Sequence, residues 1–337
     1  IFKEIFSINM KLKKILLIGG GGYVGSVLTP LLLKKNYLVT VFDLFIYGTD
    51  KLQKHKNLKI IQGDMRDAAL LKNVISGHDC IIHLACISND PSFDLNPELG
   101  KSVNYDSFLP LVKISKASKC SNFIYASSSS VYGLKSEPNV NENMSLEPLT
   151  DYSKFKVLCE KIILDNQNDH FTTTVIRPAT VCGYAPRQRM DLTVNILTNH
   201  AVNNKRILVF GGDQKRPNIN IKDMARVYVK VLESEKSKIA GEIFNAGYEN
   251  YTIRKLAEIV RKKIDEKTTI DFQSTNDQRS YHISSEKIKE KLDFQNHYDI
   301  GEAVVSLKMA FENKKLKDPL NNPLYFNIQR MKQINLK

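Results

Sequence analysis

The stretch Leu16-Leu17-Ile18-Gly19-Gly20-Gly21-Gly22-Tyr23-Val24-Gly25 decides the fold of this chain. An apolar run breaks into glycines and then resumes with an amphipathic pattern, which predicts a strand, a tight turn and the start of a helix. The glycines at 19, 22 and 25 allow a sharp turn, a close approach of backbone to a pyrophosphate, and close packing of helix on strand. Because short glycine motifs recur by chance, this stretch alone is equally compatible with an ordinary loop.

Length and composition indicate a globular protein. A chain of 337 residues, 42% hydrophobic and 25% charged, suits one large or two ordinary domains with a sizeable core. No apolar run approaches the roughly 20 residues of a membrane span, and the first residues lack the apolar core of a signal peptide. We therefore expect a cytoplasmic protein without a membrane partner. The five cysteines lack the paired spacing of zinc sites, so we expect free thiols and no metal.

The net charge of +13 raises the question of nucleic-acid binding. However, the 38 lysines and 11 arginines are spread along the chain and do not gather on one element. This pattern favours a compositional bias, so no nucleic-acid partner is expected. Anionic substrates would still be attracted by the positive charge.

A carboxylate follows the glycine turn at an informative distance. The segment Leu38–Asp43 is expected to be a strand that ends in an acid 18 residues beyond Gly25. An acid there can bind the adenosine ribose hydroxyls of NAD, whereas it would repel the 2′-phosphate of NADP. Taken singly, Asp43 is also compatible with a turn. Joined to the glycines, it makes NAD the expected cofactor.

Further strand patterns alternate with helical ones through the first half of the chain. The remaining strands of the sheet are expected at Leu58–Gln62, Cys80–Leu84, Phe123–Ala126, Thr173–Arg177 and Glu242–Asn245. This alternation predicts an α/β protein with a Rossmann-type doubly wound parallel sheet.

Two groups of polar residues could carry chemistry. Ser127–Ser130 follow an expected strand, at the edge where ligands bind in such sheets, although a polar turn is the alternative. Tyr152 and Lys156 are spaced to share one face of an expected helix. A lysine beside a phenol can lower the pKa of the phenol far below its usual value of about 10, which yields a base usable near neutral pH. The pair alone is better explained by two surface residues that share a helix face by chance.

The glycine turn, Asp43, Asp64, Ser128 and the Tyr152-x-x-x-Lys156 pair, in this order, resemble the extended short-chain dehydrogenase/reductases, and most closely the branch acting on nucleotide sugars. The resemblance covers about residues 12–310. It implies that Tyr152 is the catalytic base, that Lys156 also binds the nicotinamide ribose, and that Ser128 hydrogen-bonds the reacting oxygen. The residues it assigns to the cofactor are Gly19, Gly22, Tyr23, Val24, Gly25, Asp43, Asp64, Met65, Ala85, Asn104 and Lys156.

The same resemblance implies a site for a nucleotide-diphosphate sugar. The residues it assigns to this substrate are Ser129, Thr180, Arg187, Arg189, Arg216 and Arg279. The first two arginines precede an expected helix start, which suits a diphosphate, although a solvated basic loop is the alternative. Thr180 stands where galactose-type epimerases commonly have Asn.

The resemblance also divides the chain and suggests its assembly. Residues 10–180 plus about 218–247 would form the NAD-binding Rossmann domain, and about 181–217 plus 248–337 a smaller mixed α/β substrate-binding domain. A homodimer is expected, through helices beginning near Lys101 and Asp151. We expect the tail, residues 314–337, to pack on the smaller domain and to carry no chemistry.

The reaction expected from the resemblance is epimerisation through transient oxidation of a sugar hydroxyl, most often at C4. Dehydratases of this branch usually follow their hydroxyl residue with Asp-Glu, but here Ser129 and Ser130 hold those positions. A 4,6-dehydratase is therefore disfavoured. A 4-dehydrogenase or 4-ketoreductase is the alternative, because the segment 186–195 is similar to one in relatives that oxidise GDP-heptoses. A non-catalytic NAD- or nucleic-acid-binding protein is the least favoured hypothesis.

Overall fold

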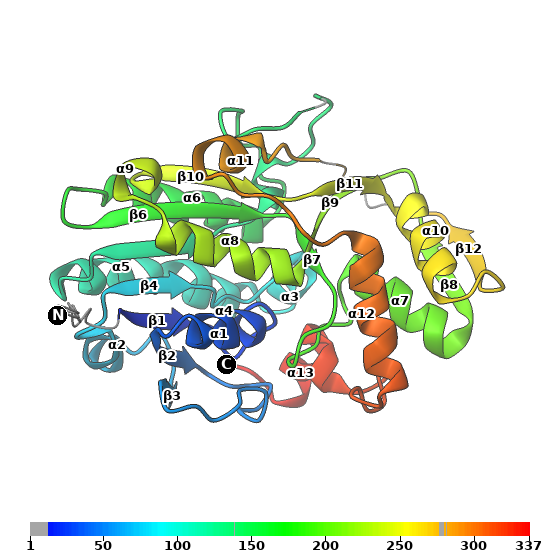
Figure 1. Cartoon of the computed structure of the whole chain (residues 1–337), viewed down its shortest axis with the longest axis horizontal. Coiled ribbons are helices and arrows are strands. Elements are labelled where there is room, and N and C mark those ends of the chain that lie inside the picture. The colour runs from blue at the N-terminus through cyan, green and yellow to red at the C-terminus, as the bar shows by residue number, and fades with distance from the viewer. Residues whose placement is uncertain (1–12, 138, 276–279, 281) are drawn as a thin grey trace, which may run out of the picture.

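A seven-stranded parallel sheet forms the centre of the molecule in the computed structural model, which describes residues 13–137, 139–275, 280 and 282–337 (Figure 1). In spatial order the strands are β3 (Leu58–Gln62), β2 (Leu38–Asp43), β1 (Lys14–Ile18), β4 (Cys80–His83), β5 (Asn122–Ala126), β6 (Thr172–Pro178) and β10 (Glu242–Ala246). The order reverses direction beside β1, as in a doubly wound sheet, so the predicted fold class is confirmed.

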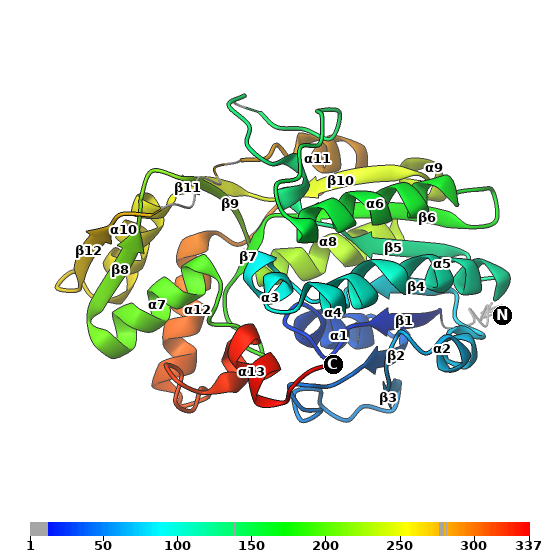
Figure 2. The ribbon, with the colours of Figure 1, turned by 180° about the vertical axis from the view of Figure 1, so that it is seen from behind.

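Helices cover both faces of this sheet because successive strand residues are buried on opposite sides. Ile15 and Leu17 belong to one core cluster, and Leu16 and Ile18 belong to another. The first face carries α1 (Gly25–Lys34), α8 (Ile221–Glu233), α9 (Lys236–Ile239) and α11 (Glu286–Leu292). The second face, seen in Figure 2, carries α2 (Ala68–Ile75), α5 (Phe108–Ala117) and α6 (Asp151–Asp165).

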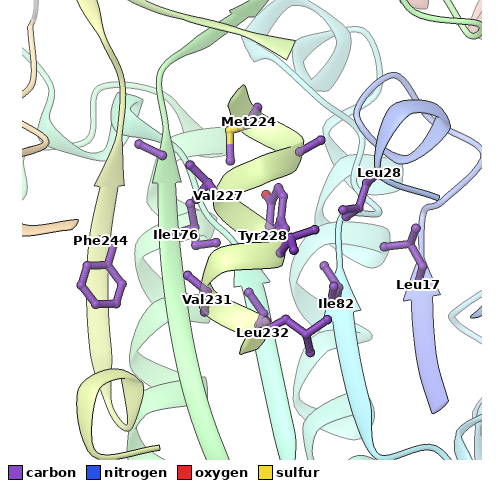
Figure 3. Packing of buried hydrophobic residues seen from close by; sticks show 14 of the residues in the cluster. Leu17, Leu28, Ile82, Ile176, Met224, Val227, Tyr228, Val231, Leu232 and Phe244 are labelled. Atoms are coloured by element: carbon purple, nitrogen blue, oxygen red, sulfur yellow. The ribbon is translucent and has the colours of Figure 1, made fainter. Parts of the chain in front are cut away.

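The core between α8 and the sheet is packed from side chains distant in sequence (Figure 3). Tyr228 and Leu232 of α8 lie over the strands that carry Ile82 and Ile176, and Leu28 of α1 lies beside them. Helix α8 thereby covers strands that come earlier in the sequence. This packing fixes the strand ends that build the site.

The long connection from β4 to α5 is largely helical. It folds as α3 (Asp90–Asp94), α4 (Pro97–Lys101) and the π-helical turn η1 (Ser102–Asp106). Asn89 and Asn96 cap the two short helices, since their side chains accept hydrogen bonds from the amides of Ser92 and Leu99. A proline stands at the second helical position of α3 and at the first of α4, which suits a helix start.

A smaller mixed α/β part lies beyond the carboxyl ends of the main sheet (Figure 1). Its strands are β7 (Thr180–Cys182), β8 (Arg206–Phe210), β9 (Lys215–Asn220), β11 (Glu249–Thr252) and β12 (Thr269–Gln273). Its helices are α7 (Thr193–Asn204), α10 (Ile253–Ile264) and α12 (Ile300–Glu312), which share one apolar core. None of the helices in the described ranges is both long and apolar enough to cross a membrane.

The tail contradicts our expectation that it packs only on the smaller part. After Leu316, which does pack there, the chain forms η3 (Pro323–Tyr325) and α13 (Asn327–Gln333). Met331 of α13 belongs to the core cluster of the main sheet, together with Ile18 and Met65. The tail therefore crosses from the smaller part to the main sheet.

Candidate active site

The carboxyl ends of the parallel strands open into one cavity of about 460 Å³. The expected site residues that line it are Gly19, Gly22, Tyr23, Val24, Gly25, Asp43, Asp64, Met65, Ala85, Ser128, Ser129, Tyr152, Lys156, Thr180, Arg187, Arg189 and Arg216. Arg279 lies outside the described residues. Residues spread over most of the sequence are thus brought to one place.

The glycine turn is built so tightly that side chains are excluded from it. Gly19 has φ of +83°, and a Cβ atom there would lie 2.4 Å from the backbone nitrogen of Ala85. A Cβ atom on Gly25 would lie 2.5 Å from backbone atoms of Gly20. Because α1 begins at Gly25, the positive end of that helix faces a cradle of bare backbone, which suits a pyrophosphate.

Asp43 is held at the end of β2 by two backbone amides. Its Oδ2 atom accepts from Gly21 at 2.9 Å and its Oδ1 atom accepts from Phe45 at 2.7 Å. Burial raises the pKa of the Asp43 carboxyl, and these hydrogen bonds, with the charge of Arg187, partly offset the rise. Nearby, Asp64 accepts from the guanidinium of Arg66, with Oδ2 and Nη2 2.6 Å apart. Burial alone would raise the pKa of Asp64, but its bonds to Arg66 lower it.

The hydroxyl and phenol groups come from β5 and α6. Ser128 ends the extended segment after β5, and its Oγ atom accepts from the amide of Ser130 at 3.1 Å. Lys156 donates from Nζ to the carbonyl oxygen of Ala126 at 2.7 Å. The same ammonium lies 5.8 Å from the ring centroid of Tyr152, on the preceding turn of α6. The predicted sharing of one helix face therefore brings a cation beside the phenol.

Directly behind this group lies a buried ion pair that our sequence reasoning missed. Glu160 accepts from Arg177 at 3.0 Å and 2.6 Å, and it also accepts from the hydroxyl of Ser127. Glu160 follows Lys156 by four residues, as Lys156 follows Tyr152, so all three share one face of α6. The spacing of four residues between Tyr152 and Lys156, continued by four more, leads to Glu160 and could have revealed it.

The arginines that line the cavity make different contacts. The amide of Arg187 donates to Ser26 of α1 at 3.3 Å, and its guanidinium lies 3.5 Å from the ring centroid of Tyr47. Arg187 is therefore beside the glycine turn and the end of β2. Arg189 donates to Asp191 at 2.8 Å, and Arg216 of β9 lines the cavity separately.

Asn104 and Tyr23, both expected at the cofactor, form hydrogen bonds to other segments of the protein. Asn104 is not among the residues that line the cavity. Its amide group pairs with the backbone of Ile87 at 2.8 Å and 3.0 Å, and so fixes the loop after β4. Tyr23 does line the cavity, and its hydroxyl donates to Gly183 at 2.5 Å and accepts from Asn195 at 3.0 Å. The glycine turn is thereby joined to the smaller part.

The tail contributes to the cavity, although we assigned it no chemistry. Asn327, Met331 and Leu336 all line the cavity. Tyr47 and Ser88 also line it and bind the side chain of Asn327 at 2.8 Å and 2.9 Å. No motif in the tail pointed to these contacts.

The cavity fits NAD at the end that contains β1 and β2. The bare backbone of the glycine turn suits a pyrophosphate, and the Asp43 carboxylate suits a ribose diol. Arg187 is 3% exposed, and within the described part of the chain its Nε and Nη1 atoms have no acceptor. Buried donors of this kind favour an anionic ligand.

Comparisons with known proteins agree with this geometry. The model of the NAD dependent epimerase/dehydratase family matches residues 15–247. An uncharacterised UDP-glucose epimerase of Bacillus subtilis is 31% identical over 272 residues, which cover 77% of this chain and 84% of that protein. A UDP-glucose 4-epimerase of Lactobacillus helveticus is 25% identical over 271 residues, covering 73% of this chain and 81% of that protein.

Solved structures share the fold. A dTDP-glucose 4,6-dehydratase from Streptomyces venezuelae with NAD bound superposes with a TM-score of 0.82 at 21% identity, covering 91% of this chain and 100% of that chain. A UDP-glucose 4-epimerase from Thermotoga maritima superposes with a TM-score of 0.81 at 22% identity, covering 90% of this chain and 100% of that chain.

Proposed function

The chain belongs to the NAD dependent epimerase/dehydratase family, and we propose that it is a nucleotide-sugar epimerase that oxidises a sugar hydroxyl transiently, at C4, with Tyr152 as the base. It is an NAD-dependent enzyme. In this proposal residues 10–180 plus about 218–247 hold the cofactor, and about 181–217 plus 248–337 hold most of the substrate. The observation that carries the proposal is the meeting of Ser128, Tyr152 and Lys156 in the cavity that contains the glycine turn.

Each polar residue has a definite role in this reaction. Tyr152 takes the proton of the sugar hydroxyl as a phenolate and returns it later as a phenol. Lys156 stabilises that phenolate by its positive charge, and its hydrogen bond to Ala126 holds the ammonium in place. Ser128 donates to the reacting oxygen. Bound NAD supplies a hydride acceptor that becomes a hydride donor, so no net redox change is left.

Ser129 and Ser130 support epimerisation over 4,6-dehydration. Removing water across C5 and C6 needs a general acid and a general base. The hydroxyls at these positions supply neither, and Ser130 instead shares a hydrogen bond of 2.8 Å with Ser128. Epimerisation needs only the Tyr152 proton shuttle and a ketone that turns over in the site.

The substrate class is proposed from charge and from the relatives. Arg189 and Arg216 both line the cavity, and a diphosphate is the group that two arginines bind well. Thr180 lines the same cavity, and in this proposal it contacts the sugar. The relatives are named for UDP-glucose. We accordingly propose a nucleoside-diphosphate sugar as substrate.

One assay separates epimerase from dehydrogenase. The purified protein is incubated with UDP-, GDP- and dTDP-sugars while NADH absorbance and product stereochemistry are followed. An epimerase yields an inverted sugar without net NADH. Net NADH with a keto-sugar product would instead establish the 4-dehydrogenase or 4-ketoreductase, and a GDP-heptose should be included to test it.

We also propose a homodimer formed through α5 and α6. Leu109 of α5 and Leu158 of α6 are exposed apolar residues, 37% and 41% accessible, on the helices that the family resemblance assigns to the interface. Light scattering should give a mass near twice 38.4 kDa. A Leu158→Glu variant should shift that mass toward the monomer.

A further inference from the structure

The last residues of the chain form a clasp (Phe326–Lys337) across the cavity. Figures 1 and 2 both place this red segment, which contains α13, next to α1 and β2. Before the clasp, Tyr325 of η3 accepts from the amide of Met190 at 2.8 Å. Within the clasp, Arg330 of α13 donates to the carbonyl oxygen of Ile46, just after β2. The clasp is therefore attached to both parts of the molecule.

Asn327 is the residue that joins these attachments. Its amide nitrogen donates to Asp191 at 3.0 Å, and its Nδ2 atom donates to Ser88 at 2.9 Å. Its Oδ1 atom accepts from Tyr47 at 2.8 Å and from Arg187 at 2.7 Å. The residue is 4% exposed. A buried amide with this many strong contacts holds its neighbours in one arrangement.

The apolar side chains of the clasp lie at the cofactor end of the cavity. Met331 packs in the core cluster that contains Phe42 of β2 and Met65, which follows β3. Leu336 packs against the same cluster and lines the cavity. Met65 and Asp64, the residues expected to border the adenine, lie in the same lining. The clasp thus covers the end of the cavity where Asp43 stands.

Arg187 is held toward the same end by Asn327. Its Nη2 atom is bound to Asn327, while Nε and Nη1 have no acceptor in the ranges that the structure describes. Burial lowers the pKa of this guanidinium, and the nearby charge of Arg189 lowers it further. A diphosphate in the cavity would supply the missing acceptors.

We infer that the clasp is part of the NAD site: it covers the adenosine end of the cofactor, and Asn327 orients Arg187 to bind the cofactor pyrophosphate, so that NAD leaves only when the clasp opens. Asn327 is a positioning residue here, since it acts through Arg187. The inference rests on NAD binding and not on the proposed epimerisation, so an inactive but NAD-retaining protein would leave it intact.

The test measures exchange of bound NAD with isotopically labelled NAD in the purified holoprotein. Asn327→Ala removes two acceptor contacts and one donor contact, and it should speed exchange about 10- to 100-fold, the loss expected for a buried hydrogen-bond network. Met331→Ala should speed it as well. Gln329→Ala makes the same chemical change on an exposed position of α13 and should leave the rate within about twofold.

A double-variant cycle then asks whether Asn327 acts through Arg187. Arg187→Met should also speed exchange, and adding Asn327→Ala to it should have little further effect. The diphosphate bound by Arg187 could also belong to the substrate, so the affinity of each variant for UDP is measured as well. If Asn327→Ala weakened UDP binding but left NAD exchange unchanged, Arg187 would belong to the substrate site and the inference would be wrong.

A second measurement requires no variant and so does not depend on folding of the mutants. Hydrogen exchange of the amides in residues 327–337 should slow when NAD is bound, relative to protein stripped of nucleotide. Equal exchange in both states would overturn the inference, as would wild-type NAD exchange in folded Asn327→Ala and Met331→Ala proteins.

Discussion

Arg177 of β6 and Glu160 of α6 form a buried, two-point ion pair, with Nε to Oε1 at 3.0 Å and Nη2 to Oε2 at 2.6 Å. The guanidinium also donates to the hydroxyl of Tyr132 at 2.8 Å, and Ser127 donates to Glu160. Burial disfavours the charge of Arg177, but these contacts raise its pKa. The pair therefore fixes α6 against the strand ends directly behind Ser128.

Breaking this pair should cost much stability. Glu160→Gln keeps the shape of the side chain but leaves the Arg177 charge buried without its counter-ion, and the free energy of unfolding should fall by about 3–5 kcal/mol. Urea unfolding followed by circular dichroism measures this. Asp106→Asn is the control, because its pair with Lys101 is half exposed and should be worth at most about 1 kcal/mol. Equal losses in both variants would mean that the buried pair does not support the fold.

Tyr152→Phe should separate chemistry from cofactor binding. The variant loses only the hydroxyl, so we expect the bound NAD to remain and turnover to fall by about 10²- to 10⁴-fold, the usual contribution of a positioned proton carrier. Nucleotide released from the denatured protein gives NAD content, and product stereochemistry gives turnover. Tyr105→Phe, at a tyrosine outside the cavity lining, should behave like the unmodified protein. Near-normal turnover of Tyr152→Phe would remove Tyr152 from the mechanism.

Gly19 and Gly77 allow steric exclusion to be separated from backbone strain. Both have positive φ, +83° and +78°, but a Cβ atom on Gly77 meets nothing within 4 Å. Gly77→Ala should therefore lower the free energy of unfolding only by the strain of a left-handed backbone, about 1–2 kcal/mol. Gly19→Ala must in addition displace the backbone at Ala85, so it should lose more stability and most of its bound NAD. Thermal melts and NAD content of the two variants make the comparison. Equal behaviour would show that the close approach of Gly19 and Ala85 is not required.

The sequence was most informative where chemistry depends on local spacing. The Gly19 turn, the Asp43 strand end and the Tyr152–Lys156 pair each lie within one strand, turn or helix, so their geometry follows from residue order alone. The seven-stranded sheet was predictable for the same reason, because its strands are short apolar runs between helical patterns.

Contacts between distant segments were not predictable. Asn327 meets Tyr47, Ser88 and Arg187 only because the tail returns across the cavity, and no periodicity in the tail encodes that path. The contact of the Arg187 backbone amide with Ser26 of α1 likewise joins segments far apart in the sequence, and the helix that follows Arg187 does not encode it.

His83 should make folding stability depend on pH. The ring is packed between aromatic neighbours, with centroids 5.6 Å from Phe108 and 5.8 Å from Tyr125. Burial, with the nearby charge of Lys156, lowers the pKa of His83 to about 3. Because the unfolded chain has a histidine pKa of about 6.5, it binds a proton below that pH while the folded protein does not. The contribution of His83 is thus fully present above about pH 6.5 and is lost progressively as the pH falls toward 3.

Unfolding measured at pH 7.5 and at pH 5 checks this. The His83 contribution alone should lower the free energy of unfolding by about 2 kcal/mol between these values, from about 1.4 kcal/mol for each pH unit below 6.5. His83→Leu removes the titrating ring and should flatten the dependence by that amount, whatever its effect on stability at neutral pH. His170→Leu, at an exposed position, should leave the slope unchanged. A slope that survives in His83→Leu would mean that His83 takes up its proton in the folded protein as readily as in the unfolded chain.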